Sequence, residues 1–237
     1  MVDGLVGSEM CIRDSITLFP DFFTTPLNSG LLGKAFDKKI AKVNLVNPRD
    51  YTTDKYKKVD DESYGGGVGM ILKPEPIFAA VESLPTLSRR EVILLTPQGK
   101  TMHQGLFREL ATDYEQLILI CGHYEGIDER VQYLVSREVS LGDFILTGGE
   151  IPALALMNGV VRLLPGTVGK AESLKSESFE SGLLEYPHYT RPANFRGWKV
   201  PEVLLSGHHA EIARWRYQQQ VHRTKSRRPD LLKNDDD

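Results

Sequence analysis

Cysteine is scarce in this sequence, and long apolar runs are missing from it. The 237 residues include two cysteines, Cys11 and Cys121, which provide neither a disulfide framework nor a metal-ligand spacing. No apolar run approaches the ~18 residues of a membrane span, and residues 1–15 lack the apolar segment of a signal peptide. These absences argue against a disulfide-rich secreted domain and a membrane partner, and we expect a cytoplasmic protein.

The sequence also lacks the residues that bind a triphosphate. A glycine-rich stretch at residues 64–70 (YGGGVGM) has no Lys-Ser or Lys-Thr pair and does not follow a predicted strand. This argues against a P-loop and against the dinucleotide-binding motif of an oxidoreductase. We expect a loop whose backbone can approach a flat ligand closely, because glycine has no side chain to block the approach.

Short apolar strands that alternate with helices are what the sequence does contain. Buried strands are predicted at residues 16–19, 43–46, 90–95, 116–121 and 139–146. Helices are predicted at residues 22–32, 74–84, 104–113 and 127–134. This alternation indicates an α/β fold with a mostly parallel sheet.

The last three predicted strands each lead into a loop that contains glycine, at residues 96–99, 122–126 and 141–149. Gly148 and Gly149 permit a backbone turn that a side chain would block, and Pro152 fits the first turn of the next helix. Ligands of open α/β sheets bind where strands end. None of the three loops contains lysine, so they suit a planar, polar ligand such as an adenosine. Taken alone, the Gly148-Gly149 loop is better explained as an ordinary tight turn, and the two similar loops upstream favour a ligand site.

The net charge of −3 conceals a basic C-terminal segment. Between residues 186 and 233 there are ten Lys and Arg against three acids, interleaved with aromatic residues. Such a segment is typical of a nucleic-acid interface or, equally, of a solvated surface helix. Residues 169–181 are polar and rich in Ser and Glu, so we expect a flexible linker there and a small helical domain at residues 182–237.

Four motifs in this order resemble the bacterial tRNA (guanine-N1)-methyltransferases of the SPOUT family. They are TPQG at residues 96–99, CGHYEGIDER at 121–130, SLGDFILTGGE at 140–150 and ESFESGLLEYPHYTRP at 177–192. The resemblance implies a knotted α/β domain at residues 16–168, with a deep C-terminal trefoil knot, followed by a tRNA-binding domain. It also implies a homodimer that uses S-adenosylmethionine to methylate N1 of guanosine 37, beside the anticodon, with no role for DNA.

The resemblance also implies the site residues. Arg162 matches the family's essential arginine, and Glu177 matches its general base, where the family usually has Asp. Glu125 would face either the amino group of the cofactor or a Mg²⁺ ion, and no metal ligands are carried over. The cofactor would be bound by Thr96, Pro97, Gln98, Gly99, Gly122, Tyr124, Glu125, Leu141, Gly142, Phe144, Leu146, Gly148 and Gly149.

The sequence departs from the family at its start, since residues 1–15 have no match there, and we interpret them as a non-native extension without function. Two other functions stay open. The first is methylation of a ribose 2′-hydroxyl by an RNA methyltransferase of the same class. The second is RNA binding without catalysis.

Overall fold

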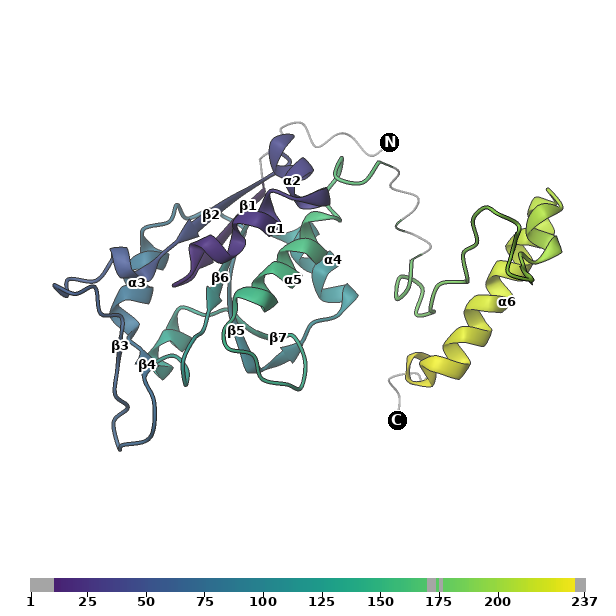
Figure 1. Ribbon diagram of the computed structural model, residues 1–237. Coiled ribbons are helices and arrows are strands. Elements are labelled where there is room, and N and C mark those ends of the chain that lie inside the picture. The colour runs from purple at the N-terminus through teal and green to yellow at the C-terminus, as the bar shows by residue number, and fades with distance from the viewer. Residues whose placement is uncertain (1–10, 170–173, 175–176, 233–237) are drawn as a thin grey trace. The chain divides into compact units, whose positions relative to one another are not determined.

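The computed structural model describes residues 11–169, 174 and 177–232. The chain forms two compact units, Met1–Gly169 and Lys170–Asp237 (Figure 1). The first unit contains a parallel sheet with its helices, and the second contains one long helix with an extended segment. None of the helices in the described part of the chain has the length and apolar character needed to span a bilayer.

Five parallel strands form the sheet of the first unit. Their order is β2 (Ala41–Val46), β1 (Cys11–Ile16), β6 (Gln116–Cys121), β5 (Arg90–Thr101) and β7 (Arg137–Ser140). Each neighbouring pair in this order is parallel. The predicted α/β class with a parallel sheet is therefore confirmed.

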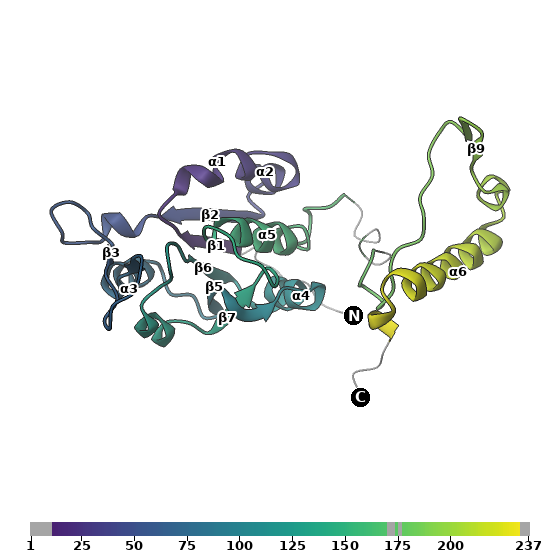
Figure 2. The same cartoon turned by 60° about the horizontal axis from the view of Figure 1, so that its bottom comes forward.

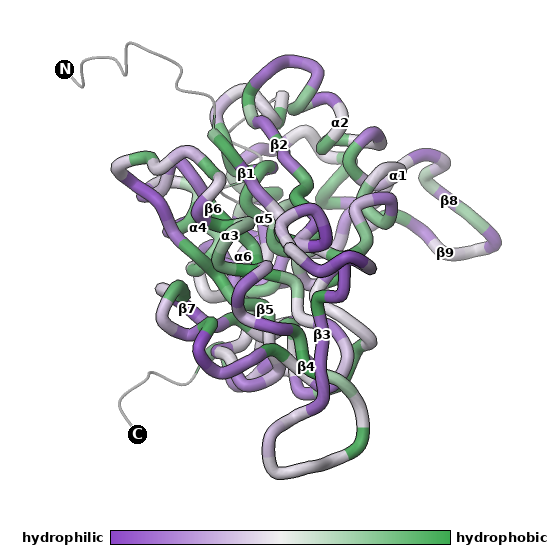
Figure 3. The backbone as a smooth tube through the Cα atoms, turned by 90° about the vertical axis from the view of Figure 1, so that its left-hand side faces the viewer, coloured by the Kyte–Doolittle hydropathy of each residue, from purple (hydrophilic) through white to green (hydrophobic). Residues whose placement is uncertain are grey.

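Helices cover both faces of this sheet (Figure 2). One face packs against α1 (Thr24–Leu27), α2 (Gly30–Asp37), α4 (Gln104–Asp113) and α5 (Glu150–Val161). The other packs against α3 (Pro74–Glu82) and the 3-10 helix η3 (Glu129–Tyr133). The central strand β6 serves both cores, since Leu117 and Leu119 point to one face and Ile118 and Ile120 to the other. Figure 3 accordingly shows hydrophobic colour around β6 and α5.

The first strand lies earlier in the chain than predicted. We expected it at residues 16–19, but β1 ends at Ile16 and the chain then turns. Thr17 Oγ1 accepts a hydrogen bond from the backbone N–H of Phe19 at 3.0 Å, and the 3-10 helix η1 (Pro20–Phe23) follows. Residues 11–15 of the expected extension are therefore part of the sheet, and residues 1–10 lie outside the described part of the chain.

The predicted strand at residues 139–146 is wrong in its second half. β7 ends at Ser140, and Phe144, Ile145 and Leu146 follow in irregular structure. Their exposed fractions are 54%, 79% and 36%, so the apolar run does not enter the core. A short apolar run gives no information on whether its side chains face a core or a ligand site.

Two predicted helices are also wrong in detail. The helix expected at residues 22–32 is divided into α1 and α2 by a turn at Asn28. Gly33 lies inside α2, where a Cβ would come within 2.8 Å of the Asn28 carbonyl carbon. Glycine thus lets α2 pack directly on the turn. The helix expected at residues 127–134 is the shorter 3-10 helix η3.

A hairpin joins β2 to α3 by way of the 3-10 helix η2 (Pro48–Asp50). Its strands are β3 (Asp60–Asp61) and β4 (Ile71–Leu72), and they pair antiparallel. The glycine-rich stretch lies between them, with the side chains of Tyr64 and Val68 fully exposed.

The second unit is built on α6 (His209–Arg227). Before it come the short hairpin strands β8 (Asn194–Phe195) and β9 (Trp198–Lys199) and the 3-10 helix η5 (Glu202–Leu205), and after it comes η6 (Pro229–Leu232). Trp198 of this hairpin is 72% exposed. Residues 177–181, the end of the predicted linker, form turns within this unit.

Candidate ligand-binding site

A cavity of about 610 Å³ lies in the first unit, where β5, β6 and β7 end. Residues 94–98, 122–129 and 138–149, with the exception of Asp143, contribute to its wall, together with Val131, Gln132 and Pro152. The three main wall segments follow three neighbouring parallel strands. The cavity therefore occupies the edge of the sheet at which ligands of open α/β proteins bind.

The structure brings together 12 of the 13 residues that we expected to bind the cofactor. They are Thr96, Pro97, Gln98, Gly122, Tyr124, Glu125, Leu141, Gly142, Phe144, Leu146, Gly148 and Gly149. The thirteenth, Gly99, lies in β5 and outside the wall. A Cβ on Gly99 would come within 2.4 Å of the Val139 backbone nitrogen, so this glycine lets β5 approach β7.

The first wall segment is a bulge within a strand. We expected β5 to end at Leu95, but it continues to Thr101. Leu95 and Lys100 both pair with Val139, so the four residues between them protrude from the ladder. Bulges of this kind re-aim side chains next to functional sites.

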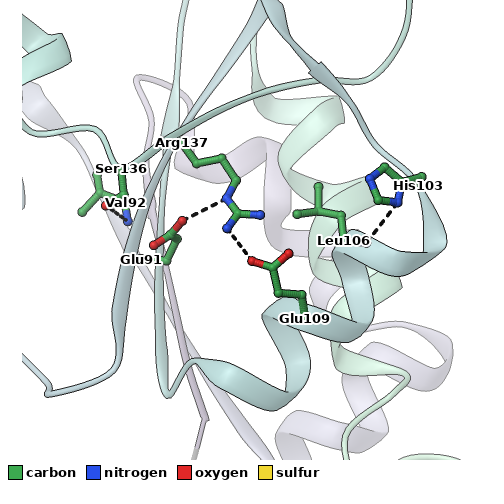
Figure 4. A network of polar contacts seen from close by, with 7 residues as sticks. All are labelled: Glu91, Val92, His103, Leu106, Glu109, Ser136 and Arg137. Carbon is green, nitrogen blue, oxygen red and sulfur yellow. Dashed lines mark hydrogen bonds and ion pairs between the residues drawn. The ribbon is translucent and has the colours of Figure 1, made fainter. Parts of the chain in front are cut away.

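An ion-pair network fixes the edge strand β7, which leads into the third wall segment (Figure 4). Arg137 Nε lies 3.0 Å from Glu91 Oε1 on β5, and its Nη2 pairs with Glu109 Oε1 on α4. The hydrogen bond from Arg137 lowers the pKa of Glu109, and bonds to both acids raise the pKa of Arg137. One side chain thus joins β7 to both a neighbouring strand and a helix.

The third wall segment lies directly on the end of β6. The Gly149 N–H donates to the Gly122 carbonyl at 2.9 Å, and a Cβ on Gly149 would lie 2.7 Å from Cys121 Cα. A Cβ on Gly148 would lie 2.3 Å from Glu150 Oε2 and 2.6 Å from His123 Nδ1. Neither glycine has a positive φ. The Gly-Gly pair is therefore needed because a side chain at either position would be blocked, and not because the backbone requires a positive φ.

A buried carboxylate lies beneath this approach, and sequence reasoning missed it. Glu150, at the first position of α5, is 5% exposed and accepts a 2.8 Å hydrogen bond from Thr17 Oγ1. The signal available in the sequence was an acid directly after Gly-Gly and at a helix N-terminus, where negative charge is stabilised. Burial, and then the Glu150 carboxylate, raise the pKa of the Cys121 thiol well above its usual value, so this thiol is unreactive at neutral pH.

The charge of the wall is negative. Glu125, Asp128, Glu129 and Glu138 contribute to it, and the described wall residues include neither Lys nor Arg. Asp128 caps η3 by accepting from the Arg130 N–H, and hydrogen bonds from the Arg130 guanidinium lower the pKa of Asp128. The wall suits a ligand with net positive charge, because opposite charges attract most strongly in sites that exclude water.

Aromatic rings form one rim of the cavity. The His123 ring lies between Phe19 and Tyr124, with centroid distances of 4.8 and 4.9 Å. Tyr124 has a φ of 60°, which is uncommon outside glycine, and its hydroxyl accepts from Arg49 Nη2 at 3.4 Å. His123 and Arg49 are thus further side chains at the site that the sequence did not identify.

The two residues expected to be catalytic do not line this cavity. Arg162 caps the C-terminus of α5, a helix of 12 residues whose other end touches the cavity. At 1.5 Å per residue that helix is about 18 Å long. Glu177 belongs to the second unit, in a turn where the Glu180 N–H donates to its carbonyl at 3.3 Å. Among the described residues there is no cluster of three or more His, Cys, Asp or Glu that could hold a metal ion.

The fold and the cavity define a class: α/β proteins that bind a small ligand at the carboxyl edge of a parallel sheet. Within this class, the sequence model of the tRNA (guanine-1)-methyltransferase TrmD family matches residues 11–234. The chain belongs to this family. The resemblance that the four motifs predicted is therefore confirmed, and the match includes residues 11–15.

Similar proteins cover nearly the whole chain. A tRNA (guanine-N(1)-)-methyltransferase of Trichodesmium erythraeum is 93% identical over 223 residues, which are 94% of this chain and 98% of that protein. Proteins of the same name from a Nostoc and a Synechocystis species are 75% and 73% identical. The matches cover 92% of this chain in both cases, and 87% and 94% of those two proteins.

Proposed function

We propose that the protein transfers a methyl group from S-adenosylmethionine to N1 of guanosine 37 in tRNA. The observation that carries the proposal is the gathering of three wall segments, two of which contain glycines and acidic residues, around one cavity at the strand ends. Family membership and the names of the relatives support the same reaction. A cytoplasmic location, where tRNA is found, belongs to the same proposal.

The cavity fits this cofactor in charge and shape. S-adenosylmethionine bears a sulfonium, an ammonium and a carboxylate, so its net charge is positive and matches the acidic wall. Gly148 and Gly149 line the cavity without side chains, which leaves their main-chain groups to meet a flat adenine. When bound, the cofactor supplies a methyl group that its sulfonium has already activated. Glu125 is placed on the wall for the cofactor's amino group or for a Mg²⁺ ion.

The protein's own residues would then handle a proton and a charge. Guanine N1 is protonated at neutral pH, so a base must remove this proton as the nitrogen attacks, and we assign that role to Glu177. As the proton leaves, negative charge moves to O6 of guanine. A fixed guanidinium stabilises such a charge, and we assign this role to Arg162.

The position of Arg162 supports a homodimer. In a single chain Arg162 lies at the end of α5 away from the cavity. Apolar side chains are exposed beside the near end, with Phe22 on η1 at 48%, Ile151 on α5 at 47% and Ile145 at 79%. Apolar patches of this kind mark interaction surfaces. We propose that two copies associate through this patch and that the arginine of each copy serves the cavity of the other.

The second unit supports the RNA part of the proposal. Arg214, Arg216, Lys225 and Arg227 are exposed on α6. On the β8–β9 hairpin, Trp198 is exposed and the Arg196 guanidinium lies 5.2 Å from the Phe195 ring centroid. Bases splayed from an RNA loop stack on such aromatic and guanidinium groups, and the basic residues hold phosphates.

The test is a transfer assay with methyl-labelled cofactor and unmodified tRNA transcripts that carry either G or A at position 37. We expect label on N1 of G37 and none on the A37 transcript. Label on a ribose 2′-oxygen would establish the first alternative. RNA binding without transfer under any tested condition would establish the second.

A further inference from the structure

We infer that Thr224 of α6 is a positioning residue that fixes the turn bearing Glu177 to the basic helix. The inference rests on the proposed function, because it takes Glu177 as the general base. It adds that the turn bearing the Glu177 carboxylate is held within the second unit by the Thr224 hydroxyl, which is distant from it in sequence.

Thr224 is unusual within its helix. It is the one buried residue among the 19 of α6, with an exposed fraction of 0%. Its Oγ1 donates to the Gln220 carbonyl at 2.7 Å, a bond that threonine often makes inside helices. The same oxygen also accepts from the Leu184 N–H at 2.8 Å, which is a contact across 40 residues of sequence. The hydroxyl therefore connects α6 to the segment that follows Glu177.

That segment is closed on itself by further hydrogen bonds. The Glu185 N–H donates to Ser178 Oγ at 2.9 Å, and the Phe179 N–H donates to the Leu183 carbonyl at 2.9 Å. Ser178 is the immediate neighbour of Glu177. Through Leu184 and Glu185, the position of the candidate base is thus linked to Thr224 by a short series of named bonds.

A second contact joins the same turn to the C-terminal end of α6. The Arg228 guanidinium lies 5.7 Å from the Phe179 ring centroid and is itself held by Asp230, with Nη2 2.6 Å from Oδ2. The turn is therefore attached to the helix at two places, one at Thr224 and one just after the last residue of α6. Two attachments restrict rotation of the turn, which a single contact does not.

The basic residues beside Thr224 give this attachment a functional meaning. Arg223 and Arg227 line a cavity of about 480 Å³ together with Ser178, Leu184 and Glu185 of the turn. An RNA phosphate bound by these arginines would meet the same rigid group that carries Glu177. Binding energy obtained away from the reacting base would then be used to place the carboxylate, and such placement is worth large factors in rate.

The test compares Thr224→Val, which keeps the shape but removes the hydroxyl, with Thr224→Ser, which keeps the hydroxyl. At saturating tRNA and cofactor, we expect Thr224→Val to lower kcat about 10-fold to 100-fold, in line with the cost of small misplacements. The dissociation constants for tRNA and cofactor should stay within about twofold, and Thr224→Ser should retain wild-type kcat. Ser226→Ala is the matched control, because Ser226 lies on α6 with its hydroxyl bonded only to the Arg223 carbonyl in the described contacts.

A double-mutant cycle separates positioning from general stability. If Thr224 acts through Glu177, Thr224→Val should have no further effect in the Glu177→Gln background. Equal losses in both backgrounds, or an unchanged kcat in Thr224→Val, would overturn the inference. Wild-type turnover of Glu177→Gln alone would instead overturn the proposed role of Glu177. Should Thr224→Val fail to fold, Ser178→Ala breaks the same series of bonds at its other end. Equal losses in both backgrounds, or an unchanged kcat in Ser178→Ala, would then overturn the inference.

Discussion

Thr17 Oγ1 donates a 2.8 Å hydrogen bond to Glu150 Oε1, joining the end of β1 to the first residue of α5 across 133 residues of sequence. Both side chains are buried. The bond lies next to the wall segment that ends at Gly149, so it anchors this part of the cavity. The Gly-Gly pair in the sequence indicated this wall segment but not the bond that anchors it.

Thr17→Val should destabilise the protein and weaken cofactor binding. Removing the hydroxyl leaves a buried carboxylate without this donor, which costs about 1–3 kcal/mol. Urea unfolding measures the loss, and Thr25→Val serves as control because Thr25 is exposed. An unfolding free energy equal to that of the wild type would contradict the anchoring role of this bond.

Arg13→Leu should stabilise the protein. Arg13 is 0% exposed in β1, which lies between β2 and β6, and its Nε and Nη2 atoms have no hydrogen-bond partner among the described residues. Burial lowers the pKa of its guanidinium. Replacing a poorly paired buried charge by an apolar side chain can gain about 1–4 kcal/mol in unfolding free energy.

Lys42→Leu is the control for that gain, because Lys42 is exposed on the neighbouring strand β2. If Arg13→Leu were less stable than the wild type, the Arg13 guanidinium would contribute more stabilising interactions than its hydrogen bonds indicate.

The network around Arg137 predicts a pH dependence of stability. Because Arg137 lowers the pKa of Glu109 in the folded protein, this pairing contributes fully above the unfolded value of about 4.3 and is lost as pH falls through the folded value. In Arg137→Met the loss of stability below about pH 4.3 should therefore be smaller than in the wild type.

At neutral pH the same variant should be less stable by about 1–3 kcal/mol, since it leaves the nearly buried Glu91 carboxylate without its partner. Thermal unfolding of both proteins across this pH range measures the two effects. If the stability of the wild type and of the variant changed with pH in the same way, the network would not be the cause of the pH dependence.

The sequence predicted those elements whose signals are local. β6 and α4 have the predicted bounds, because an unbroken apolar run fits a strand buried on both faces and an amphipathic decapeptide fits a helix. β1 was placed five residues too late because Arg13, Asp14 and Ser15 carry no strand pattern. Only pairing with β2 and β6 makes these residues a strand.

The motifs predicted which residues line the site, but they did not predict the contacts that hold these residues in place. The wall residues come from three segments that the motifs contain, so their gathering follows from the order of parallel strands. The bond from Thr17 to Glu150 and the tilted contact between the Phe19 and His123 rings join distant segments. The bulge that exposes Thr96–Gln98 depends on both β5 and β7. No single stretch of sequence contains these relationships.

Gly148→Ala should weaken cofactor binding while the protein stays folded. The added methyl group would come within 3 Å of both Glu150 Oε2 and His123 Nδ1, so these two side chains or the wall segment must shift. Gly169→Ala is the matched control, because no atom of the described residues lies within 4 Å of the Cβ that it would add.

Calorimetric titration of S-adenosylmethionine into these three proteins tests the central claim, that the cavity at the ends of β5, β6 and β7 holds the methyl donor. We predict one cofactor bound per cavity in the wild type and in Gly169→Ala, and at least about a tenfold loss of affinity in Gly148→Ala, equivalent to 1.4 kcal/mol. Equal affinity in Gly148→Ala, or no uptake by the folded wild type with tRNA present or absent, would contradict the account.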